Sequence, residues 1–315
     1  MSARPARRLF SRRRSALPDR AGVARRSRLP AGSGLGRAPG RLAGLALNYG
    51  LPVAFILLPL LSFLAHSFFF VDKGEIVYSF TMLNYARFFA DKIFVPIFFK
   101  TCLLALEVAG ISVVVGYPIA FFLAGLEGRL KYAVTLFFVI PLLMSYIIKI
   151  YAIRSILGGN GLLNRTLLNL GIIDEPWTFL IFNLNAVMLT LAILLVPFAI
   201  LPIFVALEKV PRDLLEASAD LGASAARTFR HIILPLSLQG VIIGASFTFV
   251  LAIGDFVTPQ MVGGTQGFTF GRIVYSQFGF GNNWPFGAAL SVVLLIPVVA
   301  AVVLADRFNR ARYDA

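Results

Sequence analysis

The sequence has few of the residues that build metal and catalytic sites. It contains one cysteine, Cys102, which excludes an intrachain disulfide, and two histidines, His66 and His231, which lie far apart along the chain. No Cys/His cluster is therefore available to hold zinc or an iron–sulfur centre, and no paired catalytic groups can be identified. We expect no catalytic residue, no metal site and no cofactor bound by this chain.

Charged residues are also scarce, at 14% of the 315 residues, whereas hydrophobic residues make up 58%. This composition is typical of a polytopic membrane protein. The formal net charge of +14 does not indicate nucleic-acid binding, because twelve of the 29 basic residues lie within residues 1–41 and the others flank apolar runs. The composition therefore predicts membrane lipid, and no nucleic acid, as a partner.

The first 41 residues combine many arginines with a single acid, Asp19, and with scattered proline and glycine. Because the segment has no sustained apolar face, we predict a disordered, Arg-rich cytoplasmic tail at 1–41. An organellar transit peptide is the alternative for an Arg- and Ser-rich, acid-poor N-terminus. A secretory signal is not expected, since no small-residue cleavage site follows a short apolar core.

Six apolar runs long enough to cross a bilayer follow the tail, and they predict an all-α integral membrane protein. The basic residues of alternate loops favour a cytoplasmic location for both termini. Prolines inside the runs are expected to kink the helices without breaking them. Helical spacing also predicts interfacial helices within 78–93 and 160–177. The transmembrane domain is expected at 45–305, with spans near 45–70, 94–124, 133–153, 184–207, 236–253 and 286–305, and a cytoplasmic C-terminus at 306–315.

A polar stretch interrupts this pattern between the fourth and fifth runs, within a predicted cytoplasmic loop at 208–235. Pro211 and Asp213 are typical of the first turn of a helix, Gly222 of a C-terminal cap, and Ser224 of the N-cap of a second short helix. The stretch is too short to bury a core of its own. It is therefore either an ordinary solvated loop or an element that docks on a partner.

The side chains of the first of these helices favour docking. Leu214, Ala217 and Leu221 form an apolar stripe, and Glu216 and Asp220 are like charges four residues apart, which destabilise an isolated helix slightly. An acidic face that is not relieved within the helix indicates a basic partner.

The same stretch resembles the EAA motif of ABC importer permeases. It has Glu216-Ala217-Ser218, then Gly222, and it closes on Leu234-Pro235 at the family's spacing, with Ser218 in place of the second alanine. In that family this loop is the coupling helix, which docks on a cytoplasmic ATPase subunit. The resemblance implies that ATP and Mg bind to partner chains, and no G-x-x-x-x-G-K-[ST] loop is found here. The coupling residues that it implies are Glu216, Ala217, Ser218, Asp220, Gly222, Arg227 and Pro235.

Further segments, among them Gly116-Tyr117-Pro118, 254–259 and 283–289, resemble the first permease subunit of spermidine/putrescine importers, over roughly 45–305. That resemblance implies the type I ABC importer permease fold in a bacterial inner membrane, and transport of polyamines or a related small amine. It also implies two ABC ATPase subunits, a second homologous permease and an extracytoplasmic solute-binding protein as partners. The same architecture also imports ferric iron, sulfate, molybdate, opines or amino-acid-like amines. A secondary transporter, which would need its own coupling-ion site, is the alternative outside this class.

Candidate substrate-path residues are Glu107, Asp255, Tyr117, Tyr146 and Lys149. Glu107 lies near the middle of the second run, where an ionised carboxylate indicates either a pathway role or a structural partner on a neighbouring helix. Asp255 is expected near the outer end of the fifth run, in an ion pair with a cation such as Lys149 or in contact with the passing amine. Lys149 stands where the family resemblance implies an arginine, and lysine lacks the bidentate geometry of arginine.

Overall fold

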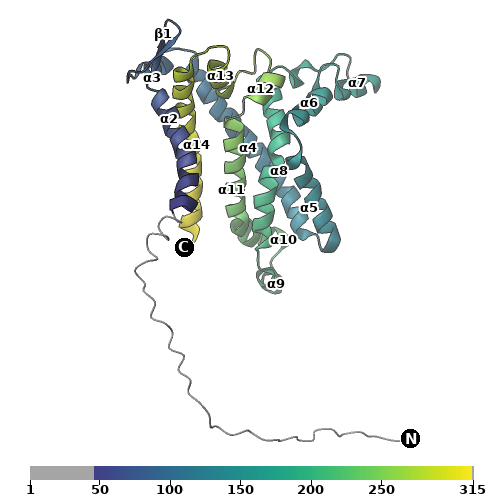
Figure 1. Cartoon of the computed structure of the whole chain (residues 1–315). Coiled ribbons are helices and arrows are strands. Elements are labelled where there is room, and N and C mark those ends of the chain that lie inside the picture. The colour runs from purple at the N-terminus through teal and green to yellow at the C-terminus, as the bar shows by residue number, and fades with distance from the viewer. Residues whose placement is uncertain (1–45, 314–315) are drawn as a thin grey trace, which may run out of the picture. The chain divides into compact units, whose positions relative to one another are not determined.

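The computed structural model describes residues 46–313 of the chain (Figure 1). The predicted tail at 1–41 lies outside these residues. A π-helical turn, η1 (Ala46–Gly50), leads into α2 (Leu51–His66). Residues 57–313 form one compact unit, which contains the polar loop and the candidate substrate-path residues.

The membrane-spanning helices follow the predicted apolar runs. Among the described residues, five helices are long and apolar enough to cross a membrane, and a sixth span is a bent pair of helices. The five are 48–66, which includes α2, then α4 (Phe94–Gly125), α8 (Leu184–Glu208), the helix at 225–253, and the apolar part of α14 (Trp284–Tyr313). The prediction of about six spans is confirmed.

The expectation that proline kinks the third span without breaking it was wrong. This span is divided into α5 (Gly128–Leu143) and α6 (Tyr146–Leu157), and the segments 128–143 and 146–169 are bent by 100°. Met144 between them has extended backbone, with a ψ of 149°, and Ser145 is also non-helical, with a ψ of 131°. Pro141, one turn earlier, removes a backbone donor and weakens the helix there, and the two non-helical residues then turn the chain.

The helix of the fifth span is continuous with the second helix of the polar loop. It runs through α10 (Ala225–Thr228), η3 (Phe229–Ile233) and α11 (Leu234–Ile253), and so includes the predicted span 236–253. η3 is a π-helical turn directly before Pro235, where the missing N–H of proline interrupts the regular hydrogen-bond ladder. The turn lets the helix continue past a proline that, in the sequence, indicates a helix boundary.

The core is formed by α4, α8 and α11, which pack closely through small residues. A Cβ on Gly240 of α11 would lie 2.5 Å from the carbonyl oxygen of Pro202 and 2.6 Å from Cβ of Ala206, both on α8. One turn further on, Gly244 meets the backbone of Ala199 in the same way, at 3.0 Å. Small residues at such spacing allow two membrane helices to approach backbone to backbone.

The two ends of the compact unit carry different elements (Figure 1). One end carries α9 (Arg212–Asp220) and the start of α5. The opposite end carries an antiparallel hairpin of β1 (Phe70–Asp72) and β2 (Glu75–Val77), together with α3 (Leu83–Ala90), α7 (Leu162–Asn169), η2 (Thr178–Leu180), α12 (Val257–Val262) and α13 (Phe270–Phe278). The helices predicted within 78–93 and 160–177 are confirmed as α3 and α7, whereas the hairpin, α12 and α13 were not predicted.

Candidate functional site

The polar loop between α8 and α11 is built from local capping interactions. α9 begins after Pro211 and ends in a Schellman arrangement, in which the N–H of Gly222 donates to Ala219 O at 2.9 Å and the N–H of Ala223 donates to Ser218 O at 3.0 Å. Gly222 adopts a φ of +71°, which favours glycine. The Ser224 side chain then accepts a hydrogen bond from the backbone N–H of Arg227 and caps the next helix. The predicted caps at Gly222 and Ser224 are confirmed, whereas Pro211, predicted in the first turn, lies at the N-cap position before α9.

The acidic and apolar faces of α9 point away from the rest of the protein. Glu216, Ala217 and Asp220 are exposed, and the side chain of Leu221 is 87% exposed. Neither acid belongs to an ion pair within the described residues. An exposed apolar stripe flanked by unpaired acids favours binding of a partner with a basic surface. Binding buries the apolar side chains and pairs the acids.

Ser218 lies on the opposite face of α9 and is 7% exposed. Its Oγ is 2.6 Å from Oγ1 of Thr228 on α10, so a hydroxyl pair connects the two helices of the loop. The serine that replaces the second alanine of the motif is therefore a positioning residue within the chain. Arg227 is exposed on α10, and Pro235 is half-buried at the start of α11.

A second polar cluster lies at the opposite end of the unit. Tyr146, the first residue of α6, donates its hydroxyl hydrogen to Oδ2 of Asp255 at 2.9 Å, and the hydroxyl is 3.0 Å from Oγ1 of Thr258. Asp255 also accepts hydrogen bonds from the backbone N–H groups of Val257 and Thr258, at 3.0 and 3.3 Å. The cluster connects the bent span to the N-terminus of α12.

The ion pair expected for Asp255 with a cation such as Lys149 is wrong, whereas the alternative role, contact with the passing amine, stays a prediction. None of the ion pairs within the described residues involves Asp255, and Lys149 Nζ lies 5.6 Å from the centre of the Tyr146 ring. The carboxylate of Asp255 is stabilised instead by hydrogen bonds from the Tyr146 hydroxyl and from the backbone N–H groups that open α12. Three of the five candidate path residues, Tyr146, Lys149 and Asp255, are thus brought together.

The other two candidates lie elsewhere, on α4. The Tyr117 hydroxyl is 2.8 Å from Oγ of Ser237 on α11, and its ring packs edge-on against Phe229. Glu107, ten residues earlier and therefore about 15 Å along the helix axis, is exposed on the outer face of α4. It makes no hydrogen bond or ion pair within the described residues. A path role for both residues stays a prediction.

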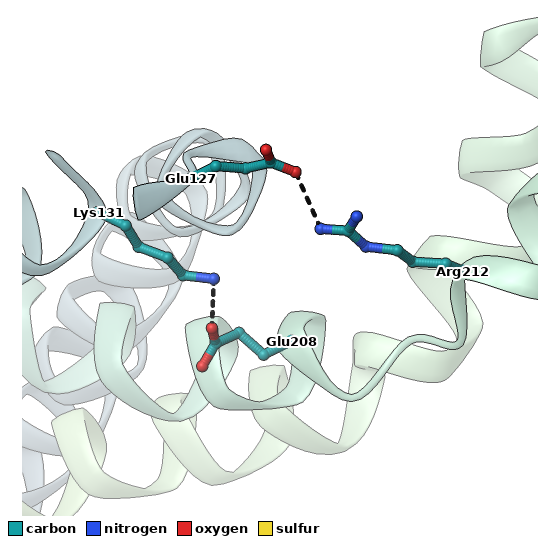
Figure 2. Close-up of polar contacts among 4 residues, drawn as sticks. All are labelled: Glu127, Lys131, Glu208 and Arg212. Carbon is teal, nitrogen blue, oxygen red and sulfur yellow. Dashed lines mark hydrogen bonds and ion pairs between the residues drawn. The ribbon is translucent and has the colours of Figure 1, made fainter. Parts of the chain in front are cut away.

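Two ion pairs at the α9 end were missed by the sequence reasoning. Lys131 of α5 pairs with Glu208 at the end of α8, and Glu127, directly before α5, pairs with Arg212 at the start of α9 (Figure 2). The basic residues of these loops indicated only membrane orientation, because nothing local identifies a partner about 80 positions away. Within residues 46–313 no group of three or more His, Cys, Asp or Glu is placed to hold a metal.

A match to a known protein family covers the part of the chain that contains α9. Residues 112–312 match the family described as "Binding-protein-dependent transport system inner membrane component". The chain belongs to this family. It is therefore a multi-pass permease subunit of the inner membrane, not an enzyme, and the predicted membership of the ABC importer permeases is confirmed. The coupling role of the EAA residues stays a prediction.

Curated relatives of this family cover most of the chain. The chain is 36% identical over 263 residues to the spermidine/putrescine transport system permease protein PotB of Escherichia coli (strain K12), covering 82% of this chain and 94% of that protein. It is 32% identical over 272 residues to PotB of Haemophilus influenzae, covering 84% and 93%.

A solved structure supports the fold. A chain of a bacterial ABC transporter involved in the import of the acidic polysaccharide alginate superposes with a TM-score of 0.62, at 15% identity, over 86% of this chain and 99% of that chain. At this identity the likeness concerns the fold alone, which is that of type I ABC importer permeases.

Proposed function

We propose that this permease carries polyamines such as spermidine and putrescine, or a closely related small amine, across the inner membrane. The observation that supports this substrate class most is the 36% identity to a spermidine/putrescine permease over 94% of that protein's length. Ferric iron, sulfate, molybdate, opines and amino-acid-like amines remain the alternatives for the same architecture.

The importer that we propose contains this chain, a second homologous permease, two ABC ATPase subunits and an extracytoplasmic solute-binding protein. ATP and Mg are held by the ATPase subunits. α9 lies on the cytoplasmic side and docks on one ATPase subunit through Glu216, Ala217 and Asp220, which are exposed. The end that carries α3, α7, α12 and α13 then faces the solute-binding protein.

Glu107 is proposed to contribute to the substrate path. Its side chain is exposed on the outer face of a membrane-spanning helix, although an ionised carboxylate in contact with lipid near the bilayer centre is costly. The free-energy cost of the ionised Glu107 side chain is lower if this face of α4 contacts the second permease or a water-filled passage. A carboxylate in such a passage attracts a cationic amine, which carries the charge opposite to its own.

Transport by a reconstituted importer tests the substrate class. The complex, with its partner subunits, is placed in proteoliposomes that contain ATP and Mg, and uptake of labelled spermidine and putrescine is measured with the solute-binding protein present. We expect saturable, ATP-dependent uptake of at least one of these amines, and no competition from molybdate or sulfate. ATP-dependent uptake of an oxyanion, with no response to any amine, would overturn the proposal.

A further inference from the structure

α5 is attached loosely to the core formed by α4 and α8. None of its residues is buried, whereas α8 has thirteen buried residues. Its apolar contacts with the core include half-buried Val134 and Phe138, which pack against a cluster formed by α4 and α8. The polar contacts at the start of α5 therefore add to only a few apolar contacts in orienting this helix.

Those contacts are the two ion pairs of Figure 2. At the start of α5 one pair is made by a basic side chain and the other by an acidic side chain. Lys131 on α5 pairs with Glu208, the last residue of α8, and its Nζ also lies 5.4 Å from the centre of the buried Phe204 ring. Glu127, one residue before α5, pairs with Arg212, the first residue of α9, at 3.1 Å. One pair thus holds α5 to the core, and the other holds it to the loop proposed to dock on the ATPase subunit.

The pairs span a space rather than a packed interface. A cavity of about 270 Å³ lies between the end of α4, the start of α5 and the polar loop, and its lining includes Lys131, Glu208, Arg212 and Leu215. The short segment 209–211, which separates Glu208 from Arg212, is the covalent connection between α8 and α9. A displacement of α9 relative to α8 therefore moves Arg212 and, through the ion pair, Glu127. The cavity leaves no close-packed layer there to resist this movement.

The exposure of the Glu127–Arg212 pair argues against a role in stability. The two side chains are 76% and 80% exposed, and an exposed pair of this kind contributes little to folding. The two pairs nevertheless flank the three-residue linker 209–211, and together they constrain the direction in which α5 moves when the loop moves.

From its attached start, α5 leads to the opposite end of the unit. It ends at the bend around Met144 and Ser145, and the next residue, Tyr146, contacts Asp255 and Thr258 at the start of α12. The contacts from Arg212 to Asp255 therefore form a continuous path between the two ends, through a span that is already divided into two segments.

We propose that the Glu127–Arg212 and Lys131–Glu208 pairs are positioning residues that transmit displacement of α9 to α5 and α6, and so to the Tyr146–Asp255 contact. This inference rests on the proposed function, because it requires an ATPase subunit that moves α9. The four charged residues touch neither substrate nor nucleotide. They determine how much of the loop's movement reaches the opposite end.

Charge exchange in the assembled importer tests the link. Transport is compared in proteoliposomes for two sets of variants. The first set contains Glu127→Arg, Arg212→Glu and their double variant. The second contains Lys131→Glu, Glu208→Lys and their double variant. Each single variant is expected to retain its ATPase subunits but to transport at least tenfold less substrate per ATP hydrolysed. Each double variant, in which the pair is restored in the reverse orientation, is expected to return to within about threefold of the wild type.

The chain offers a matched control in Asp306 and Arg310, an exposed ion pair on α14 with a separation of 2.9 Å. Its reversal is expected to leave transport per ATP unchanged. The link is wrong if the single variants at Glu127 and Arg212 couple as well as the wild type, or if the double variants are no better than the single ones. Because Glu127 and Arg212 are exposed, this pair remains informative if the Lys131 variants fail to fold. If the wild-type chain itself retains no ATPase subunit, the proposed function fails instead.

Discussion

Reversal of charge in the Glu216→Lys variant is expected to lower the affinity of the permease for its ATPase subunit by roughly 30-fold or more. Loss of one member of a buried charge pair at an interface costs about 2–5 kcal/mol, and each 1.4 kcal/mol is tenfold in affinity. Glu216 is exposed on α9 and has no ion-pair partner within the described residues, so it is free to meet a basic group. ATP-driven uptake falls with the loss of the subunit.

The measurement for this variant is the amount of ATPase subunit that copurifies with the permease, followed by uptake in proteoliposomes. Glu175→Lys is the matched control, since Glu175 is also exposed but precedes η2, at the end opposite α9. The control is expected to retain its ATPase subunits. Normal copurification and uptake by Glu216→Lys would show that the acidic face of α9 is not the docking surface.

Removal of the charge at Glu107, in the Glu107→Gln variant, is expected to weaken uptake of a polyamine by roughly tenfold to 100-fold. A hydrogen bond to a charged group is worth about 1.5–3 kcal/mol, and the amide keeps the shape of the side chain while it loses the charge. Glu107 lies near the middle of α4 and not in the loop that contains α9, so the ATPase subunits are expected to remain bound. The effect should therefore appear as a higher KM for the amine, measured in proteoliposomes.

The conservative variant Glu107→Asp separates charge from structure, because it keeps the carboxylate and shortens the side chain. It is expected to recover most of the uptake that Glu107→Gln loses. If both variants transport like the wild type, Glu107 does not line the path. If both lose their ATPase subunits or fail to assemble with the second permease, the residue has a structural role.

The spans could be predicted from the sequence because long apolar runs are required by the bilayer itself. The continuity of the helices was less predictable, since hydropathy reports contact with lipid and not continuity of the backbone. The helix that begins at Ala225 continues through polar residues and past Pro235 by means of η3. The bend at Met144 and Ser145 has no glycine or proline at the bend itself, and the Tyr146 contacts that follow it involve residues more than 100 positions away.

The polar loop was predictable in detail because its caps are local. Pro211, Gly222 and Ser224 act within four residues of their own positions. The Ser218–Thr228 contact and the pairs of Glu127 and Lys131 depend on which elements lie side by side, and a single sequence does not contain that information. The same reason explains why the contact of Asp255 with the Tyr146 hydroxyl, 109 positions away, was not predicted.

Site-specific photocrosslinking at α9 tests most directly whether this loop is the docking element. A photoreactive residue is placed at Ala217, which is exposed, or at Ser218, which is 7% exposed and faces Thr228, in the assembled importer. The expected result is a crosslink from position 217 to the ATPase subunit and a much weaker one from position 218. Absence of any ATPase crosslink from position 217, in a complex that still hydrolyses ATP and transports, would contradict the proposed coupling role of α9.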